Sequence, residues 1–204
     1  MTPYEIENLS FSIIDQEAKG HNFNNQEWQI VQRVIHTSAD FEYIKTIRFH
    51  PKAILSGLEA IKAGRQIITD TNMARVGIRN GEISQFGGQI KCLIGDDDVA
   101  KRAKQEGITR AIAAVDKAAK TIKDGIYVVG NAPTALLRII ELVKDGLIKP
   151  ALIVGLPVGF VNAAESKDEL IKLDYPYISN IGRKGGSNVA ASVINALAIM
   201  AAKS

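Results

Sequence analysis

Histidine is the side chain best suited to proton transfer near neutral pH, and among the histidines of this sequence His36 has the most suggestive neighbours. It stands at the predicted end of a helix, beside Thr37 and Ser38 and close to Asp40. A protonated imidazole at this place would be stabilised by the helix C-terminus and by the carboxylate. The pattern predicts either a general acid or a helix-end residue that only makes hydrogen bonds. A lone histidine is more often the second.

A glycine-containing turn, residues 130–134, leads from a predicted strand into a helix with Pro133 in its first turn. The first N–H groups of a helix have no partner within it, so such a turn can bind an anion. The same turn could instead need its glycine only for backbone geometry. It matches neither the Walker A motif nor the G-x-G-x-x-G fingerprint, so a nucleotide ligand is unsupported.

A second loop of this kind, residues 182–187, is basic. Arg183 and Lys184 add positive charge, and Gly185 and Gly186 permit a close approach to the backbone. This loop is therefore a second candidate for binding an anion such as a carboxylate.

Two further charged residues stand near predicted helix starts. Arg110 follows residues 107–109, where its guanidinium could form a bidentate pair with a ligand carboxylate or simply be solvated. Glu165 lies in the first turn of a predicted helix, which is the usual place for an acidic residue, and it is also a candidate ligand contact. Arg75 and Arg79 are weaker candidates, because exposed arginines are common.

The sequence predicts no metal site. His21, His36 and His50 are not spaced as metal ligands, and the three aspartates at 96–98 suit the start of a helix without a metal. Cys92 is the only cysteine, which excludes a disulfide framework and a cysteine-based zinc site. No cofactor is expected.

From residue 66 onward, short and mostly continuous apolar runs alternate with helical stretches, which is typical of parallel strands covered on both faces. The runs are 66–69, 90–94, 126–129, 151–154 and 177–179. We predict a single doubly wound α/β domain over residues 1–204, with helices on both faces of a parallel sheet. No internal repeat or linker suggests a second domain.

The N-terminal portion is predicted to be helical. One helix starts at a capping box at Thr2 and a second starts at Asn25. Residues 41–49 are ambiguous between strand and helix. The segment 79–82 carries a turn signal, which we interpret as a small hairpin.

In an open parallel sheet the ligand site lies beyond the carboxyl ends of the strands. The residues that follow the predicted strands are therefore candidates for binding a substrate. They are Asp70 and Met73 after the first run, Asn131 and Thr134 after the third, and Arg183, Gly185 and Gly186 after the fifth.

Composition argues against several functional classes. The 204 residues include 25 basic and 22 acidic ones, for a formal net charge of +3, so no nucleic-acid partner is expected. No basic segment followed by an apolar one opens the chain, which predicts a cytoplasmic protein without a secretion signal. The most apolar window, 189–202, is too short to span a bilayer of about 30 Å and is predicted as a buried helix.

Six strings, taken in order, resemble the precorrin-8X methylmutases of cobalamin biosynthesis. They are Val34-Ile35-His36-Thr37-Ser38-Ala39-Asp40-Phe41, Thr69-Asp70-Thr71-Asn72-Met73, Gly107-Ile108-Thr109-Arg110, Gly130-Asn131-Ala132-Pro133-Thr134-Ala135-Leu136, Gly155-Leu156-Pro157-Val158-Gly159-Phe160-Val161 and Ala163-Ala164-Glu165-Ser166-Lys167. The resemblance runs from about Ser10 to Leu197. The ordered set is far more specific than any one string.

The resemblance implies an isomerase without a cofactor that moves a methyl group from ring carbon 11 to ring carbon 12 of a corrin precursor. It also implies a flavodoxin-like fold and a homodimer with sites near the subunit interface. The family's catalytic histidine falls on His36, a substrate-associated arginine on Arg110, and a serine near the same pocket on Ser10. The form of residues 36–40 is closer to the anaerobic branch, whose substrate carries cobalt. Residues 74–79 depart from the small residues expected there.

The residue types fit this chemistry. A methyl shift around a conjugated ring needs electron demand at the carbon that receives the methyl group, and protonation of a neighbouring ring nitrogen supplies it. Histidine, with an unperturbed pKa of about 6.5, can give that proton near neutrality. The acetates and propionates of the corrin would be bound by helix N-termini, glycine-loop amides, Arg110 and Arg183.

Two rival classes stay open on the sequence alone. A non-catalytic tetrapyrrole carrier would need no proton donor at position 36, and a phosphosugar or nucleotide enzyme would use the glycine loops for phosphate. A homodimer is also predicted from the helix at 188–202, which is apolar on nearly every side. The alternative is burial of that helix within one subunit.

Overall fold

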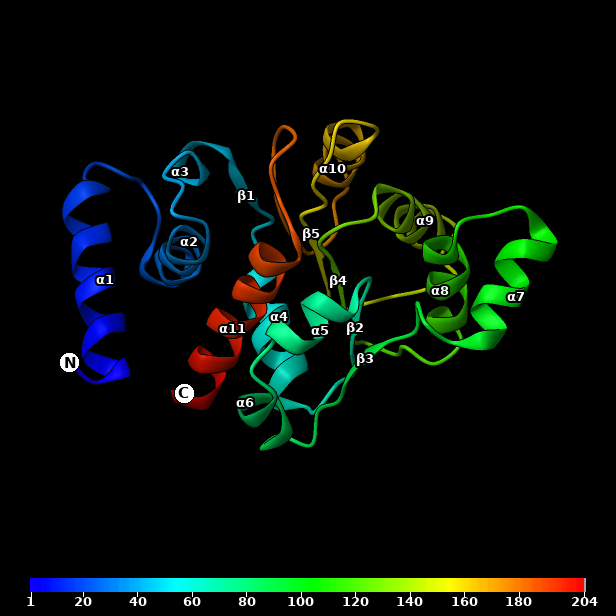
Figure 1. Cartoon of the computed structure of the whole chain (residues 1–204), viewed down its shortest axis with the longest axis horizontal. Coiled ribbons are helices and arrows are strands. Elements are labelled where there is room, and N and C mark those ends of the chain that lie inside the picture. The colour runs from blue at the N-terminus through cyan, green and yellow to red at the C-terminus, as the bar shows by residue number, and fades with distance from the viewer. Residues whose placement is uncertain (204) are drawn as a thin grey trace.

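The sheet has six strands in the order β1-β6-β5-β4-β2-β3, and all neighbours are parallel except β1 and β6 (Figure 1). The parallel strands, counted from β2, follow the order 2-1-3-4-5 of flavodoxin-like folds. The computed structural model describes residues 1–203. The predicted α/β fold is confirmed.

The strands are β1 (Ile47–Phe49), β2 (Ile67–Thr69), β3 (Ile90–Cys92), β4 (Ile126–Val129), β5 (Leu152–Gly155) and β6 (Tyr177–Asn180). The helices are α1 (Pro3–Glu17), α2 (Asn25–Ser38), α3 (Tyr43–Thr46), α4 (Ala53–Lys62), α5 (Asn72–Gly77), α6 (Asn80–Ser84), α7 (Asp97–Glu106), α8 (Arg110–Ala119), α9 (Pro133–Lys144), α10 (Ala163–Ile171) and α11 (Ser187–Lys203).

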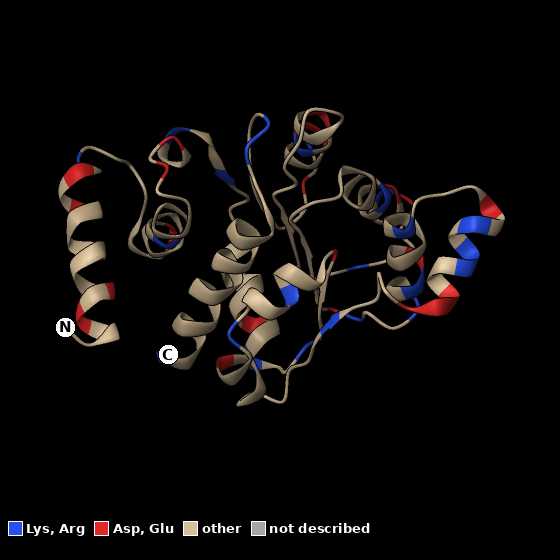
Figure 2. Cartoon of the chain, viewed as in Figure 1, with Lys and Arg blue, Asp and Glu red and all other residues tan. Residues whose placement is uncertain are grey.

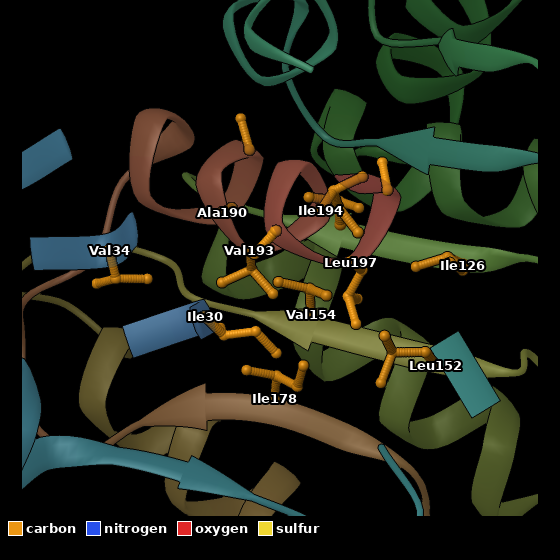
Figure 3. Packing of buried hydrophobic residues seen from close by; sticks show 14 of the residues in the cluster. Ile30, Val34, Ile126, Leu152, Val154, Ile178, Ala190, Val193, Ile194 and Leu197 are labelled. Atoms are coloured by element: carbon orange, nitrogen blue, oxygen red, sulfur yellow. The ribbon is translucent and has the colours of Figure 1, made fainter. Parts of the chain in front are cut away.

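Alternate residues of the central strands face opposite helix layers. On one face Val128 and Val154 belong to a core cluster with residues of α2, α4 and α11 (Figure 3). On the other face Tyr127 and Ile153 pack with residues of α8, α9 and α10. The sheet is therefore covered on both sides, as the continuous apolar runs predict.

Helix α11 is buried, as predicted, and its neighbours are α2, α4 and α5 from the same chain. Most of its apolar surface is therefore covered within one subunit. Of the two interpretations of this helix the structure supports burial in the monomer, and α11 gives no argument for a dimer.

Two segments differ from the simplest expectation. Residues 41–49 contain both α3 and β1, and β1 adds to the edge of the sheet as its antiparallel strand. The hairpin interpretation of 79–82 is wrong, because these residues enter α6. There Ile83 is buried against the core, and Arg79 forms an ion pair with Glu82 at 2.6 Å. Burial of one apolar side chain on a short helical turn outweighs the turn preference of Asn80 and Gly81.

Candidate active site

His36 lies in the last turn of α2, and its side chain is exposed. The helix begins at a capping box, in which Asn24 accepts hydrogen bonds from the backbone N–H groups of Gln26 and Glu27. It ends at Ala39, which has a left-handed conformation with φ of 51°.

Ser10 and His36 line the same hollow, as the resemblance implies. Ser10 comes from α1 and His36 from α2, and the hollow has a volume of about 230 Å³. The His36 ring meets the ring of Phe11 edge-on, with centroids 5.1 Å apart, while the Ser10 hydroxyl donates to the carbonyl of Ile6 at 2.9 Å. A larger groove of about 500 Å³ is lined by residues of α1, α2 and α11, among them Glu7, but not by His36.

The end of α2 is tied to the loop between β6 and α11. Lys184 Nζ donates to Asp40 Oδ2 at 2.5 Å and to Glu42 Oε2 at 2.7 Å. The hydrogen bond from Lys184 lowers the pKa of Asp40. The hydrogen bonds to the two carboxylates raise the pKa of Lys184. The side chain of Asn188 donates to the carbonyl of Thr37 at 3.5 Å. Asp40, which the sequence suggested as the partner of His36, thus has a different partner.

Asp70 occupies the turn that the sequence offered to an anionic ligand. Its Oδ1 accepts from the N–H of Gly130 at 3.0 Å, and its Oδ2 accepts from those of Asn131 and Ala132 at 2.8 Å each. Burial raises the pKa of the Asp70 carboxyl, although the three amides lower it. The expectation of free amides in this turn is wrong, because the chain provides its own anion, Asp70, directly after the neighbouring strand β2.

One glycine in each of the two loops is needed for packing within the chain. A Cβ atom at Gly130 would lie 2.6 Å from the Cα of Ser187, and one at Gly185 would lie 2.2 Å from the carbonyl oxygen of Leu156. The hydroxyl groups of Thr71 and Ser187 are 2.7 Å apart. The close backbone approach that Gly185 and Gly186 predicted is therefore made at Gly185 by another segment of the same chain.

Exposed apolar side chains lie at the same carboxyl edge. Met73, after β2, is 68% exposed, and Phe160, after β5, is 84% exposed. The guanidinium of Arg183 lies 5.4 Å from the centre of the Phe160 ring. The tip of the β6–α11 loop is basic, as Figure 2 shows. This edge combines apolar contact area with positive charge, a combination suited to a large ring with acidic substituents.

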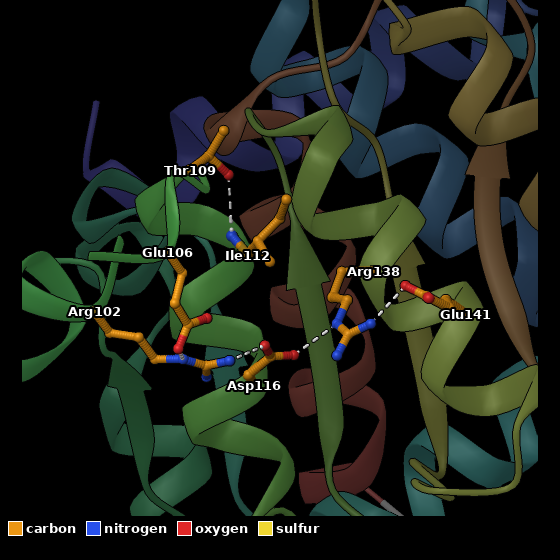
Figure 4. A network of polar contacts seen from close by, with 7 residues as sticks. All are labelled: Arg102, Glu106, Thr109, Ile112, Asp116, Arg138 and Glu141. Atoms are coloured by element: carbon orange, nitrogen blue, oxygen red, sulfur yellow. Dashed lines mark hydrogen bonds and ion pairs between the residues drawn. The ribbon is translucent and has the colours of Figure 1, made fainter. Parts of the chain in front are cut away.

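Arg110 and Thr134 lie at adjacent helix starts. Thr109 caps α8, and its hydroxyl lies 3.2 Å from that of Thr134 in the first turn of α9. Below them Asp116 accepts from Arg102 at 2.9 Å and from Arg138 at 2.6 Å, which joins α7, α8 and α9 (Figure 4). Arg110, the first residue of α8, is exposed.

Glu165 is also exposed, in the first turn of α10. In residues 1–203 no group of three His, Cys, Asp or Glu side chains is arranged to hold a metal ion. Over the same residues no helix has the length and apolar character needed to cross a membrane.

Comparison with known proteins decides the family. The family model for precorrin-8X methylmutase matches residues 5–200. A cobalt-precorrin-8 methylmutase of Priestia megaterium is 51% identical, over 98% of this chain and 88% of its own. One from Leptospira interrogans is 46% identical, over 97% and 94%. The solved structure of a precorrin-8X methylmutase from Thermus thermophilus superimposes with a TM-score of 0.92 at 43% identity, covering 98% of this chain and 97% of that one.

The chain belongs to the precorrin-8X methylmutase family. It is therefore an enzyme, an isomerase of cobalamin biosynthesis, and the carrier and phosphosugar alternatives fall away. The roles assigned above to individual residues toward the substrate stay predictions.

The sequence reasoning missed two residues of this methylmutase, Lys167 and Asn180. Both are fully buried, and both make hydrogen bonds to the backbone of the β6–α11 loop. Lys167 stands four residues after Ala163 at the start of α10, where an ordinary lysine would be solvated. Only its position on the inner face of α10, one turn after the buried Ala163, could have drawn attention to it.

Proposed function

We propose that this protein moves a methyl group from ring carbon 11 to ring carbon 12 of a corrin precursor, with His36 as the general acid. Protonation of a ring nitrogen beside carbon 12 makes that carbon electron-poor, so the methyl group migrates with its bonding electrons. The bond to carbon 11 breaks as the bond to carbon 12 forms. The proton then leaves, and no electrons are gained or lost overall.

The observation that carries the proposal is the exposed imidazole of His36, in the last turn of α2 and beside Ser10 in one hollow. A general acid must carry a proton before it acts, and imidazole is the side chain that can hold and give one near neutral pH. The Phe11 ring packs against the imidazole, with the two ring centroids 5.1 Å apart. Family membership supplies the class of substrate.

The carboxylates of the substrate are assigned to side-chain cations rather than to the amides after β4, which Asp70 already occupies. Arg110 and Arg183 are both exposed at the carboxyl edge of the sheet. Phe160, which lies against Arg183, offers a flat apolar surface to the macrocycle. Met73, Asn131, Thr134 and Glu165 are further candidate contacts on this edge.

We further propose that the substrate carries cobalt, so that cobalt-precorrin-8 is converted to cobyrinate. The relatives at 51% and 46% identity are both named cobalt-precorrin-8 methylmutase. The His-Thr-Ser-Ala-Asp string at 36–40 favours the same branch. Incubating the protein with the cobalt-bound and with the metal-free precursor, and following the absorbance spectrum, tests this assignment, because faster conversion of the metal-free form would contradict it.

The proposed assembly is a homodimer formed through α1. Ile6, Leu9 and Ile13 are 52%, 51% and 46% exposed, and their spacing places them on one side of the helix. Because Ser10 and Ile13 also line the His36 hollow, a second copy packed on α1 would close that hollow from solvent. Sedimentation velocity should give a dimer at micromolar concentration, and Leu9→Glu should shift it to a monomer. A wild-type monomer would remove this part of the proposal.

His36→Ala tests the central step. The variant should keep its fold, because truncation of an exposed helix-end residue costs about 1 kcal/mol or less. Turnover should fall by about 10²–10⁴-fold, the usual contribution of a positioned proton donor, while substrate affinity survives. In the wild type the single-turnover rate should fall as the pH rises and the imidazole loses its proton.

The matched control is His50→Ala. His50 pairs with Asp174 at 3.1 Å beside Tyr177, at the amino end of β6, so its removal should leave turnover within about twofold. Near-wild-type conversion by a folded His36→Ala variant, checked by circular dichroism, would refute the general-acid role.

A further inference from the structure

Lys167 is a buried cation that the reaction scheme above does not use. It lies in α10 with no exposed surface. Its Nζ donates to Asn180 Oδ1 at 3.1 Å and to the backbone carbonyl of Lys184 at 2.6 Å. Burial lowers the pKa of Lys167 to about 8. A buried ammonium group is costly unless it is hydrogen-bonded, so these two bonds account for its tolerance there.

Asn180 completes the arrangement from the end of β6. Its Nδ2 donates to the carbonyl of Ile181 at 3.1 Å and to that of Lys184 at 3.0 Å. The carbonyl of Lys184 therefore accepts from both buried side chains. Together, Lys167 and Asn180 close the base of the loop formed by residues 181–186, which we call the basic loop.

The basic loop carries its side chains outward from this base. Lys184 reaches Asp40 and Glu42 just after α2, and Arg183 lies over Phe160. The backbone carbonyl of Lys184 thus accepts a hydrogen bond from a buried cation, Lys167. The side chain of Lys184 binds Asp40 and Glu42 at the end of the helix that carries His36.

We propose that Lys167 is a positioning residue, whose ammonium group holds the basic loop so that Arg183 meets the substrate and Lys184 fixes the end of α2. The inference rests on the proposed function for the meaning of those two contacts. Lys167 itself touches neither substrate nor the reacting atoms. Its effect passes through the Lys184 carbonyl.

A lysine that only fills the core would act differently. Its replacement would change overall stability without a selective change in the loop or in substrate handling. A positioning role predicts a local change in the basic loop together with a loss of kcat/KM, most of it as a higher KM because Arg183 is assigned to binding.

The test compares Lys167→Met with Lys172→Met. Methionine keeps the length and apolar stem of lysine and removes the donors. Lys172 lies at the end of the same helix but is exposed, and it pairs with Glu169 at 2.8 Å. In Lys167→Met we expect amide hydrogen exchange in residues 181–186 to be at least tenfold faster, exchange in the sheet to be unchanged, and kcat/KM to be at least tenfold lower. Lys172→Met should stay within about twofold of the wild type in both measurements.

Lys184→Met provides the second half of the test, because it removes the link to Asp40 and Glu42 but leaves the backbone carbonyl in place. If Lys167 acts through that link and the loop, the losses in kcat/KM should be less than additive in the double variant. Where Lys167→Met does not fold, Asn180→Asp replaces it. This change keeps an acceptor for Lys167 and removes the two donations to the loop, so it should speed loop exchange in the same way.

Unchanged loop exchange in a folded variant would overturn the proposal, as would faster exchange with unchanged kcat/KM. Failure of the proposed function would appear elsewhere, in full turnover by His36→Ala, so the two failures are distinguishable.

Discussion

Replacing Asp70 with asparagine tests whether the β4 turn is held by an anion from the chain itself. Asparagine has nearly the same shape but only one acceptor oxygen. If that oxygen faces Asn131 and Ala132, whose N–H groups lie 2.8 Å from Oδ2 in the wild type, the new amide nitrogen faces the N–H of Gly130. Two hydrogen bonds then have a neutral acceptor in place of a charged one, and the N–H of Gly130 has no acceptor.

The cost follows from these three bonds. Hydrogen bonds to charged groups contribute about 1.5–3 kcal/mol and neutral ones about 1 kcal/mol, so the two weakened bonds lose about 1–4 kcal/mol together. An unsatisfied buried N–H costs about 1–3 kcal/mol more. The burial that raises the pKa of Asp70 also means that its charge is costly, which offsets part of the loss. We expect a net decrease of about 2–4 kcal/mol in the free energy of unfolding.

Thermal and urea denaturation of Asp70→Asn measure this decrease, which corresponds to about 4–16 °C in Tm for a domain of this size. Asp145→Asn is the control, since Asp145 is exposed at the end of α9 and should change the free energy of unfolding by less than about 0.5 kcal/mol. Equal stability of the two variants would refute the idea that the Asp70 carboxylate holds the turn.

Two further predictions concern charged residues. Arg110→Ala should weaken substrate binding more than it slows the bound-state reaction, because a carboxylate clamp acts on ground and transition states alike. If absorbance titration shows the same substrate affinity for the variant and the wild type, Arg110 is a solvated surface residue and not a substrate contact. Lys167 has a pKa of about 8 in the folded protein and an ordinary value of 10.5, so between these pH values the folded state has released a proton that the unfolded chain still binds. The difference in the free energy of unfolding between the wild type and Lys167→Met should therefore rise with pH in this window, by up to about 1.4 kcal/mol per pH unit. Urea denaturation of both proteins at pH 8 and at pH 10 measures this difference. The same difference at both pH values would contradict the lowered pKa.

Local sequence signals predicted most of the fold. The runs that became β2, β4 and β5 lie within about one residue of their predicted places, because buried parallel strands need continuous apolar residues. The capping box at Thr2 forms as expected, with Glu5 and Thr2 making both hydrogen bonds. The error at 79–82 arose because an Asn-Gly pair is compatible with a hairpin and with a short helix, and the choice depends on what covers Ile83.

The placement of Ser10 beside His36 followed from the resemblance and not from any local pattern, since the two residues lie on different helices. The choice between a buried and a dimer-forming α11 could not be made from its apolar character either. That choice depends on whether α2, α4 and α5 cover the helix, which is a property of the whole fold.

By itself the sequence determined the alternation of strands and helices, the positions of the caps and, through its ordered strings, the family. Tertiary structure alone decided the partners of the polar groups. A helix start signals that its N–H groups need an acceptor, yet it does not say whether a ligand or the chain supplies one. Here the sheet order places β2 beside β4, so Asp70 reaches the amides at 130–132. The packing of α10 against β6 likewise buries Lys167 beneath the basic loop, because hydrogen-bond partners distant in sequence are chosen by topology.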